Sequence, residues 1–193
     1  MNELNIQERL EFIRRAERLK DTLRSSYTTN GRIESVADHT WRLALLAITF
    51  ADLLPHVDLL RLLKICILHD LGEAIHGDIP APSQVGRESK SAKERRDFET
   101  LITGLPEHIR SEFLCLLDDY ESVHSNEART AKALDKIETL IQHNQGSNPE
   151  TFNYLFNLDY GRQYTDAIPI AAQIRALIDS DTLARLNDSK SRG

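Results

Sequence analysis

Cysteine is scarce in this chain of 193 residues, and long apolar runs are absent. Cys66 and Cys115 each lie within an apolar helical pattern, so we expect two buried thiols rather than the disulfide framework of a secreted protein. No apolar run approaches the roughly 18 residues that span a bilayer, and the first residues lack the apolar segment of a signal peptide. We therefore expect a cytoplasmic protein that does not enter a membrane.

An excess of basic residues is also missing, because 24 Lys and Arg stand against 30 Asp and Glu, for a formal net charge of -6. A nucleic-acid duplex is therefore not expected as the main partner, since binding its phosphates requires a basic surface. A small phosphorylated ligand is compatible with this charge, because one or two arginines and a metal ion can hold it. The length and the 40% share of hydrophobic residues favour one domain with a sizeable core.

Helical periodicity runs through the chain, and no strand-like alternation interrupts it. The sequence predicts an all-α fold, a compact single-domain helical bundle with its core at about 5–160 and a C-terminal helix at about 166–187. Leu10, Ile13 and Leu19 are expected on one apolar stripe, and Trp41 is expected to pack in the bundle. Loops are expected at about 25–32 and 78–86. The other expected helices lie at about 6–23, 36–54, 58–76, 87–103, 107–120, 126–145 (with Ser125 as N-cap) and 150–157.

The densest cluster of ionisable residues lies between Ile67 and Asp78, at the end of an apolar run. An adjacent pair, His69 and Asp70, is followed one helical turn later by Glu73. Buried charge is costly unless it is paired or bound to a metal. The pattern therefore indicates a site for a divalent cation.

Two more residues in helical stretches complete a candidate set of metal ligands. His39 lies near the start of the 36–54 helix, and Asp135 interrupts the apolar stripe of the 126–145 helix. Either residue alone is more often an ordinary core residue. Together with His69 and Asp70, however, they give the order His…His-Asp…Asp on three helices, which is hard to explain as an accident of structure. Two imidazoles and two carboxylates suit Mn²⁺, Fe²⁺, Co²⁺, Ni²⁺ or Zn²⁺.

This arrangement resembles the HD-domain phosphohydrolase superfamily and, within it, the small 5'-deoxynucleotidase-like proteins. The resemblance spans about residues 5–160 and is carried by Arg32-Ile33-Glu34-Ser35-Val36-Ala37-Asp38-His39, by His69-Asp70-Leu71-Gly72-Glu73-Ala74 with Gly77-Asp78-Ile79-Pro80, and by Ala133-Leu134-Asp135-Lys136-Ile137-Glu138. It implies a single HD domain over residues 1–193, a homodimer, and one divalent metal ion (Mn, Co, Zn, Fe, Ni or Mg). The ligands that it implies are His39, His69, Asp70 and Asp135.

The reaction needs an acid and a base, and Glu73 and Asp78 are the candidates. Glu73 follows His69 by four residues and so shares its helix face, where it can orient or deprotonate the attacking water. The resemblance supports a catalytic role at this position, and the alternative is a surface Glu paired with Lys or Arg. Asp78 matches a family Asp that protonates the leaving group or binds the sugar, and the alternative is an N-cap or Asx turn after Gly77.

Three residues are candidates for binding the substrate. Arg24 lies where the family has an arginine that contacts phosphate or substrate, and Arg32 is a second candidate for a bidentate phosphate clamp. An ordinary surface arginine is the alternative for each. His76 lies where the family has an apolar or small residue, so it either reaches the substrate or caps the helix end, where a cation is favoured.

Several other polar residues are given structural interpretations. Glu34 and Arg42 are expected to buttress the ligands, since a metal-bound histidine usually needs a partner. The segment 118–121 is expected to contribute surface packing without chemistry. Three histidines outside the ligand set are expected to be solvated: His108, His124 and His143.

The resemblance implies a metal-dependent phosphohydrolase, a 5'-nucleotidase that dephosphorylates (deoxy)nucleoside 5'-monophosphates by attack of a metal-activated water. A second hypothesis keeps the site and changes the substrate to a cyclic nucleotide, a nucleoside triphosphate or an alarmone, because a fold does not determine its substrate. A third is a metal-containing nucleotide sensor. Glu73 and Asp78 argue against the sensor, because a site without turnover has no need of acids beside four metal ligands. All three hypotheses share a small nucleotide as partner.

Overall fold

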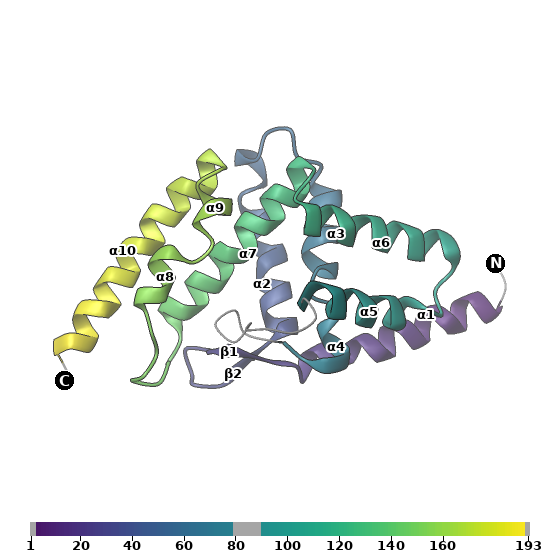
Figure 1. Cartoon of the computed structure of the whole chain (residues 1–193), viewed down its shortest axis with the longest axis horizontal. Coiled ribbons are helices and arrows are strands. Elements are labelled where there is room, and N and C mark those ends of the chain that lie inside the picture. The colour runs from purple at the N-terminus through teal and green to yellow at the C-terminus, as the bar shows by residue number, and fades with distance from the viewer. Residues whose placement is uncertain (1–2, 79–89, 192–193) are drawn as a thin grey trace.

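A computed structural model describes residues 3–78 and 90–191 of the chain (Figure 1). The expected loop at 78–86 and the start of the expected 87–103 helix therefore lie outside the described residues, apart from Asp78. The elements are α1 (Glu3–Ala16), the 3₁₀ turn η1 (Glu17–Lys20), β1 (Leu23–Tyr27), β2 (Ile33–Ser35), α2 (Val36–Thr49), the 3₁₀ turn η2 (Ala51–Leu53), α3 (Leu59–Leu68), α4 (Glu73–His76), α5 (Lys90–Ile102), α6 (Glu107–Ser122), α7 (Asn126–Gln145), α8 (Leu155–Asp159), α9 (Arg162–Thr165) and α10 (Pro169–Ser191).

Helix α7 lies at the centre of the bundle and packs against α2, α3 and α10 (Figure 1). It begins at Ser125, whose hydroxyl accepts a hydrogen bond from the Ala128 amide at 3.0 Å. Leu134, Ile137 and Leu140 on this helix are almost fully buried. Each such side chain contributes about 1.5–3 kcal/mol through burial. The helix and the N-cap predicted at 126–145 are confirmed.

Helices α2 and α3 form the second wall of the core. Ser35 caps α2 with a capping box, in which its side chain accepts from the Asp38 amide and the Asp38 side chain accepts from the Ser35 amide. Leu43 on α2 and Leu62 on α3 are fully buried within the core cluster. Cys66 is buried as predicted, but Cys115 on α6 is exposed, so the prediction of a second core thiol is wrong.

A two-stranded antiparallel sheet adds to the otherwise helical fold. Strand β1 pairs with β2 in the register Leu23 with Ser35 and Tyr27 with Ile33. The turn between them closes when the Thr28 amide donates to the Arg32 carbonyl oxygen at 2.7 Å. The all-α class is confirmed, but the expected loop at 25–32 is partly a hairpin. Its short, polar strands carry no apolar alternation that would have indicated them.

The long helix expected at 58–76 is interrupted. Helix α3 ends at Leu68, a turn follows, and α4 resumes at Glu73. The turn brings the chain close to α5, since a Cβ on Gly72 would lie 2.4 Å from the Glu94 carbonyl oxygen. Gly77, with a φ of 85°, then ends α4 in a conformation that favours glycine. The break places His69 and Asp70 at the open end of α3 rather than inside a helix.

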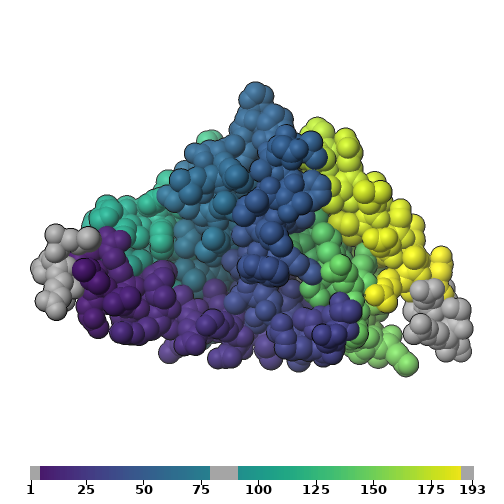
Figure 2. Space-filling view, turned by 180° about the vertical axis from the view of Figure 1, so that it is seen from behind, coloured from purple at the N-terminus to yellow at the C-terminus, as the bar shows by residue number. Residues whose placement is uncertain are grey.

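The apolar stripe expected on the first helix does not face the core along its whole length. Leu19 is buried, whereas Leu10 and Ile13 are 46% and 64% exposed. Trp41 is also 67% exposed, so the prediction that it packs in the bundle is wrong. Figure 2 shows the face of the molecule on which α1, α2 and α3 lie. Among the helices of residues 3–78 and 90–191, none is long and apolar enough to cross a bilayer.

Candidate active site and metal centre

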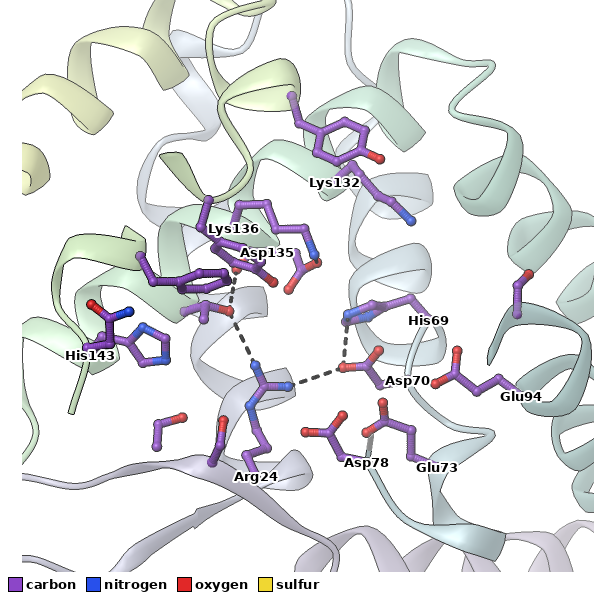
Figure 3. A pocket seen from close by; sticks show the side chains of 18 of the residues that line it. Arg24, His69, Asp70, Glu73, Asp78, Glu94, Lys132, Asp135, Lys136 and His143 are labelled. Atoms are coloured by element: carbon purple, nitrogen blue, oxygen red, sulfur yellow. Dashed lines mark hydrogen bonds and ion pairs between the residues drawn. The ribbon is translucent and has the colours of Figure 1, made fainter. Parts of the chain in front are cut away.

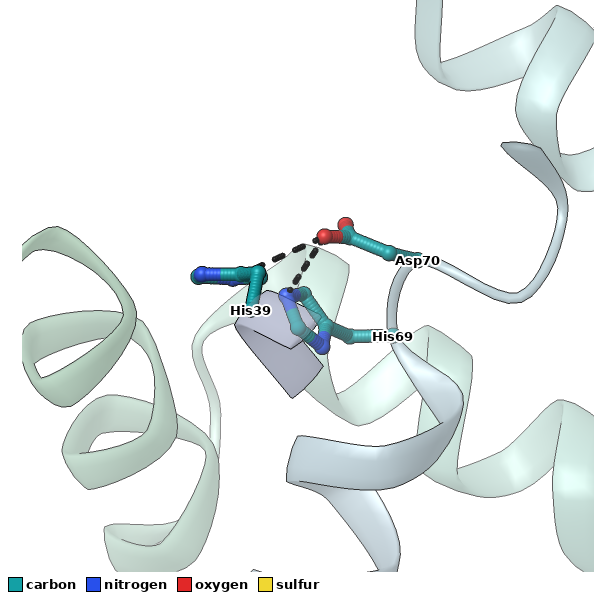
Figure 4. A group of neighbouring side chains, drawn as sticks. All are labelled: His39, His69 and Asp70. Atoms are coloured by element: carbon teal, nitrogen blue, oxygen red, sulfur yellow. Dashed lines mark ion pairs between the residues drawn. The ribbon is translucent and has the colours of Figure 1, made fainter. Parts of the chain in front are cut away.

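Three of the four residues predicted as metal ligands form one compact cluster. One ligand atom from each of His39, His69 and Asp70 lies within 4.8 Å of the other two (Figure 4). The fourth, Asp135, lies beside them, with its Oδ1 atom 3.3 Å from Nε2 of His39. The first turn of α2, the end of α3 and the middle of α7 therefore meet at this point.

Each imidazole is held by one nitrogen and presents the other to the cluster. Nδ1 of His39 hydrogen-bonds with Glu138 Oε2, and Nδ1 of His69 donates to the Cys66 carbonyl oxygen at 2.9 Å. The Nε2 atoms of both rings are buried and make no hydrogen bond with the described residues. A ring oriented through one nitrogen with a free lone pair on the other is the usual arrangement of a metal-binding histidine. The donor set therefore fits a divalent metal ion.

The electrostatics of the cluster favour a cation. Burial and Arg24 lower the pKa of His39, but Glu138 and Asp135 outweigh them and raise it to about 9. Burial alone would raise the pKa of the Asp70 carboxyl, yet His69 and His39 hold it well below its usual range. The surplus of carboxylates thus stabilises positive charge at the place where the ligand atoms meet.

The cluster opens into a cavity of about 790 Å³. Lys132, Asp135, Lys136, Thr139 and His143 line it from one face of α7, at helical spacing (Figure 3). The other polar lining residues come from β1, from the segment between His69 and Asp78, and from α5: Arg24, Ser25, Ser26, His69, Asp70, Glu73, Asp78, Ser91 and Glu94. A volume of this size matches a small-molecule site.

Both predicted acid–base residues line this cavity. Glu73 is buried in the first turn of α4, and Asp78 follows the Gly77 turn. Figure 3 shows the carboxylates of Glu73, Asp78 and Asp70 in the same part of the cavity. The surface ion pair considered as the alternative for Glu73 does not fit, because its side chain is buried.

Of the three predicted substrate-binding residues, one lines the cavity and two do not. Arg24 lines the cavity, and its Nη1 atom lies 3.7 Å from Asp70 Oδ2. Arg32 does not line it, since its exposed guanidinium pairs with Asp38 at 2.6 Å. His76 does not line it either, because its Nδ1 atom lies 2.7 Å from Asp97 Oδ2 on α5.

Glu138 and Tyr120 had no part in the site predicted from the sequence, whereas Arg42 was expected to buttress a ligand. Glu138 is 1% exposed and joins His39 to Arg42, whose Nε donates to Glu138 Oε1 at 2.6 Å. Tyr120 donates to Asp135 Oδ2 at 2.8 Å, although segment 118–121 was expected to be surface packing. Burial and Asp135 raise the pKa of Tyr120 well above its usual value, so it keeps its proton.

Lys132, Lys136 and His143 were also not placed in the site by the sequence analysis, although all three line the cavity. Lys136 Nζ lies 2.8 Å from Asp135 Oδ2, and that carboxylate raises the pKa of the lysine above its ordinary value although burial lowers it. His143 is 7% exposed, which contradicts the prediction of a solvated side chain. The spacing of these residues from Asp135 on one helix was the signal that would have found them.

Comparisons with known proteins agree with this geometry. The HD domain family model matches residues 16–175. The 5'-deoxynucleotidase HDDC2 of Bos taurus is 34% identical over 135 residues, covering 69% of this chain and 65% of that protein. The protein of the same name from Danio rerio is 36% identical over 138 residues, covering 69% of this chain and 66% of that protein. The match thus spans just under two thirds of the length of these relatives.

A solved structure shares the fold over nearly the whole chain. It is the crystal structure of a "predicted metal-dependent phosphohydrolase" from Magnetospirillum magnetotacticum MS-1, with a TM-score of 0.78 and 26% sequence identity. The similarity covers 93% of both chains. The family model matches most of the chain, and two histidines and two aspartates, His39, His69, Asp70 and Asp135, come together beside one cavity, so this protein belongs to the HD-domain family.

Proposed function

We propose that this chain is a metal-dependent phosphohydrolase, a 5'-nucleotidase that removes the phosphate of (deoxy)nucleoside 5'-monophosphates. The observation that carries the proposal is a single cavity that His69, Asp70, Asp135 and Glu73 line, with the buried His39 directly behind Asp70 and Asp135. The 5'-deoxynucleotidase name of its relatives supports the choice of substrate. The whole chain is proposed to act as one HD domain.

The proposed metal ligands are His39, His69, Asp70 and Asp135. Two imidazoles in the set favour a first-row transition ion (Mn²⁺, Fe²⁺, Co²⁺, Ni²⁺ or Zn²⁺) over Mg²⁺, which prefers oxygen ligands. When bound, such an ion acts as a Lewis acid toward a phosphoryl oxygen and lowers the pKa of water. Glu138 and the Cys66 carbonyl oxygen keep the two rings in the orientation that this role requires.

Glu73 and Asp78 are proposed to move the protons. Glu73 comes from the first turn of α4, next to Asp70, where a carboxylate can orient and deprotonate the attacking water. The departing nucleoside oxygen needs a proton, and Asp78, in the same part of the cavity, is the proposed donor (Figure 3). The turn between α3 and α4 thus joins the proposed ligand Asp70 to the proposed base Glu73.

Arg24 is proposed to hold the phosphate. Its Nη2 atom donates to Thr139 Oγ1 at 3.2 Å, and its Nε atom lies 3.3 Å from Glu34 Oε2. Burial lowers the pKa of Arg24, but the negative charges of Asp70 and Glu34 raise it by more, so the guanidinium stays charged. A fixed, desolvated cation neutralises the equatorial phosphoryl oxygens more strongly than a mobile surface arginine does. Arg32 and His76 have no part in this proposal, because they lie away from the cavity lining.

The proposal is tested by phosphate release from protein that has been stripped with a chelator and then given Mn²⁺, Co²⁺, Zn²⁺ or Mg²⁺ in turn. We expect the metal to restore release from 5'-monophosphates of ribo- and deoxyribonucleosides but not from 3'-monophosphates. Asp70→Asn should abolish release while circular dichroism shows an intact fold. Asp118→Asn is the matched control, because Asp118 is an exposed residue of α6 paired with Arg95.

Three results would count against the proposal. Full activity in Asp70→Asn would show that phosphate release does not depend on the proposed metal centre. Release from cyclic nucleotides, nucleoside triphosphates or alarmones, but not from 5'-monophosphates, would assign the site to another reaction of phosphorylated nucleotides. Tight nucleotide binding without product over hours would assign it to a sensor.

We further propose that the protein is a cytoplasmic homodimer. Both cysteines are free thiols, as is usual in a reducing compartment. Trp41, Leu45 and Ile48 are exposed at positions i, i+4 and i+7 of α2, and an apolar stripe of this kind is typical of a surface that a second copy covers. Light scattering should give twice the chain mass of 22.0 kDa, and a 22.0 kDa particle at micromolar concentration would contradict the dimer.

A further inference from the structure

Aromatic rings line part of the cavity into which the cluster of proposed ligands opens. We call three of these residues the aromatic wall: Phe152 from the segment after α7, Phe156 from α8, and Tyr160, which directly follows α8. We propose that the aromatic wall stacks the nucleobase of the substrate and makes the enzyme prefer base-bearing phosphomonoesters over base-free sugar phosphates. This inference rests on the proposed function and specifies which part of the substrate is recognised.

The three rings line the cavity rather than fill the core, although Tyr160 also packs against the core cluster. Each is half-buried, whereas the aromatic side chain Phe98 on α5 is 1% exposed. The rings of Phe156 and Tyr160 lie with centroids 5.1 Å apart and an interplanar angle of 33°. Phe152 is braced edge-on by His143, at 4.9 Å and 73°. Aromatic faces that remain open to a polar cavity bind planar bases by stacking.

Tyr160 of the aromatic wall lies within reach of a mononucleotide whose phosphate is held at the proposed metal centre. Lys136 lies between the two, with its Nζ atom 2.8 Å from Asp135 Oδ2 and 5.2 Å from the centroid of the Tyr160 ring. In a nucleoside 5'-monophosphate only the pentose separates the base from the phosphate. A phosphate held at the cluster of ligands and Arg24 therefore brings the base to the aromatic wall.

The wall is held in place from behind by Arg175 of α10, which is 1% exposed. Its guanidinium donates to the carbonyl oxygens of Asn157, Leu158 and Tyr160 at 2.7, 2.9 and 2.7 Å, and to Asp179 Oδ1 at 2.7 Å. These bonds satisfy the carbonyl groups at the end of α8, which the helix itself leaves free. A wall that is already fixed loses little conformational entropy when a base stacks on it.

Stacking alone discriminates weakly between bases, because every base has a π face. The wall should therefore accept all four bases, with purines favoured over pyrimidines through their larger stacking area. The presence of a base, rather than its identity, is the property that the wall recognises.

The experiment compares the metal-loaded wild-type enzyme with Phe156→Leu and Phe156→Ala on two substrates, deoxyadenosine 5'-monophosphate and 2-deoxyribose 5-phosphate. On the nucleotide, we expect kcat/KM to fall about tenfold or more when the ring is removed. The loss should come mainly through KM, since stacking is the same in the ground state and the transition state. On the sugar phosphate, both variants should match the wild type.

Leu155→Ala is the matched control, because Leu155 precedes Phe156 on α8, is 61% exposed and does not line the cavity. It should leave kcat/KM unchanged on both substrates. If circular dichroism shows that Phe156→Ala is misfolded, Phe156→Leu and Phe152→Leu carry the comparison, since leucine fills most of the space without a π face.

The outcomes separate this inference from the proposed function. An equal loss on both substrates, or no loss on either, would overturn the aromatic wall as a base subsite. A wild-type enzyme that hydrolyses the two substrates with equal kcat/KM would also overturn it, while leaving the nucleotidase proposal intact. No hydrolysis of either substrate with any ion would refute the proposed function, and the inference would fall with it.

Discussion

A substitution of Glu138 can distinguish a residue that supports metal binding from one that takes part in the reaction. Its carboxylate is 1% exposed and hydrogen-bonds with Nδ1 of His39 through Oε2. Its other oxygen, Oε1, accepts a 2.6 Å hydrogen bond from Arg42 Nε. Glu138→Gln keeps the shape of the side chain but removes its negative charge and one of its two acceptor oxygens. His39 then loses the carboxylate that orients its ring and raises its basicity.

The expected size of the effect follows from this geometry. Loss of such a partner of a metal-bound histidine costs about 10–100-fold in metal affinity, which corresponds to about 1.4–2.8 kcal/mol. Since Glu138 does not line the cavity, saturating metal should restore kcat to near the wild-type value. The defect should therefore appear as a shift in metal concentration dependence rather than as a loss of maximal rate.

Calorimetric titration of chelator-stripped protein with Mn²⁺ or Zn²⁺ measures the dissociation constant, and phosphate release over the same metal range measures rescue. Glu112→Gln is the control, because Glu112 is a half-exposed residue of α6 that pairs with Lys64, and neither residue lines the cavity. A dissociation constant unchanged in Glu138→Gln would refute the reasoning. A loss of kcat that saturating metal does not restore would refute it too, because Glu138 would then act on the reaction rather than on the metal.

Three other perturbations test the surroundings of the site. Tyr120→Phe removes the 2.8 Å hydrogen bond to Asp135 Oδ2, and we expect the free energy of unfolding of the metal-free protein to fall by about 1–2 kcal/mol in urea titration. Arg175→Met leaves the carbonyl oxygens of Asn157 and Tyr160 without their Arg175 donor, while Asp179 keeps Arg162, so we expect a loss of about 2–6 kcal/mol by the same assay at about 1–3 kcal/mol for each carbonyl group, and a loss below about 1 kcal/mol would contradict it. Burial holds the pKa of His143 below its ordinary value of 6.5. Below pH 6.5 the unfolded chain therefore binds more protons than the folded one, and the free energy of unfolding should decrease as the pH is lowered. In His143→Gln this dependence should be flatter in urea titrations at pH 7 and pH 5.5.

The parts of the fold that the sequence predicted are those in which one periodic signal decides the structure. The helix at 126–145 has a polar N-cap at Ser125 and an apolar stripe, and the structure confirms both. The convergence of His39, His69, Asp70 and Asp135, the proposed ligands, was predictable because they are ionisable residues in apolar surroundings. Such positions are costly unless they share a partner, and the structure brings all four together.

The parts that the sequence did not predict depend on tertiary contacts. Strand β1 is too short and polar to alternate, and it forms because Ile33 and Ser35 of β2 pair with it. The break after Leu68 is not marked by a proline, and close packing of Gly72 against Glu94 accompanies it. Trp41 was expected inside because aromatic residues often are, yet its side of α2 faces away from the core of this chain.

The proposed donors come from three segments that only the folded chain brings together, since His39 lies on α2, Asp70 follows α3 and Asp135 lies on α7. The unfolded chain offers no comparable site, so an ion that binds here stabilises the native state by mass action. At a free metal concentration of 100 times the dissociation constant this linkage amounts to about 2.7 kcal/mol. A melting temperature of this protein is therefore a property of the chain and its metal supply together, and chelation alone should lower it.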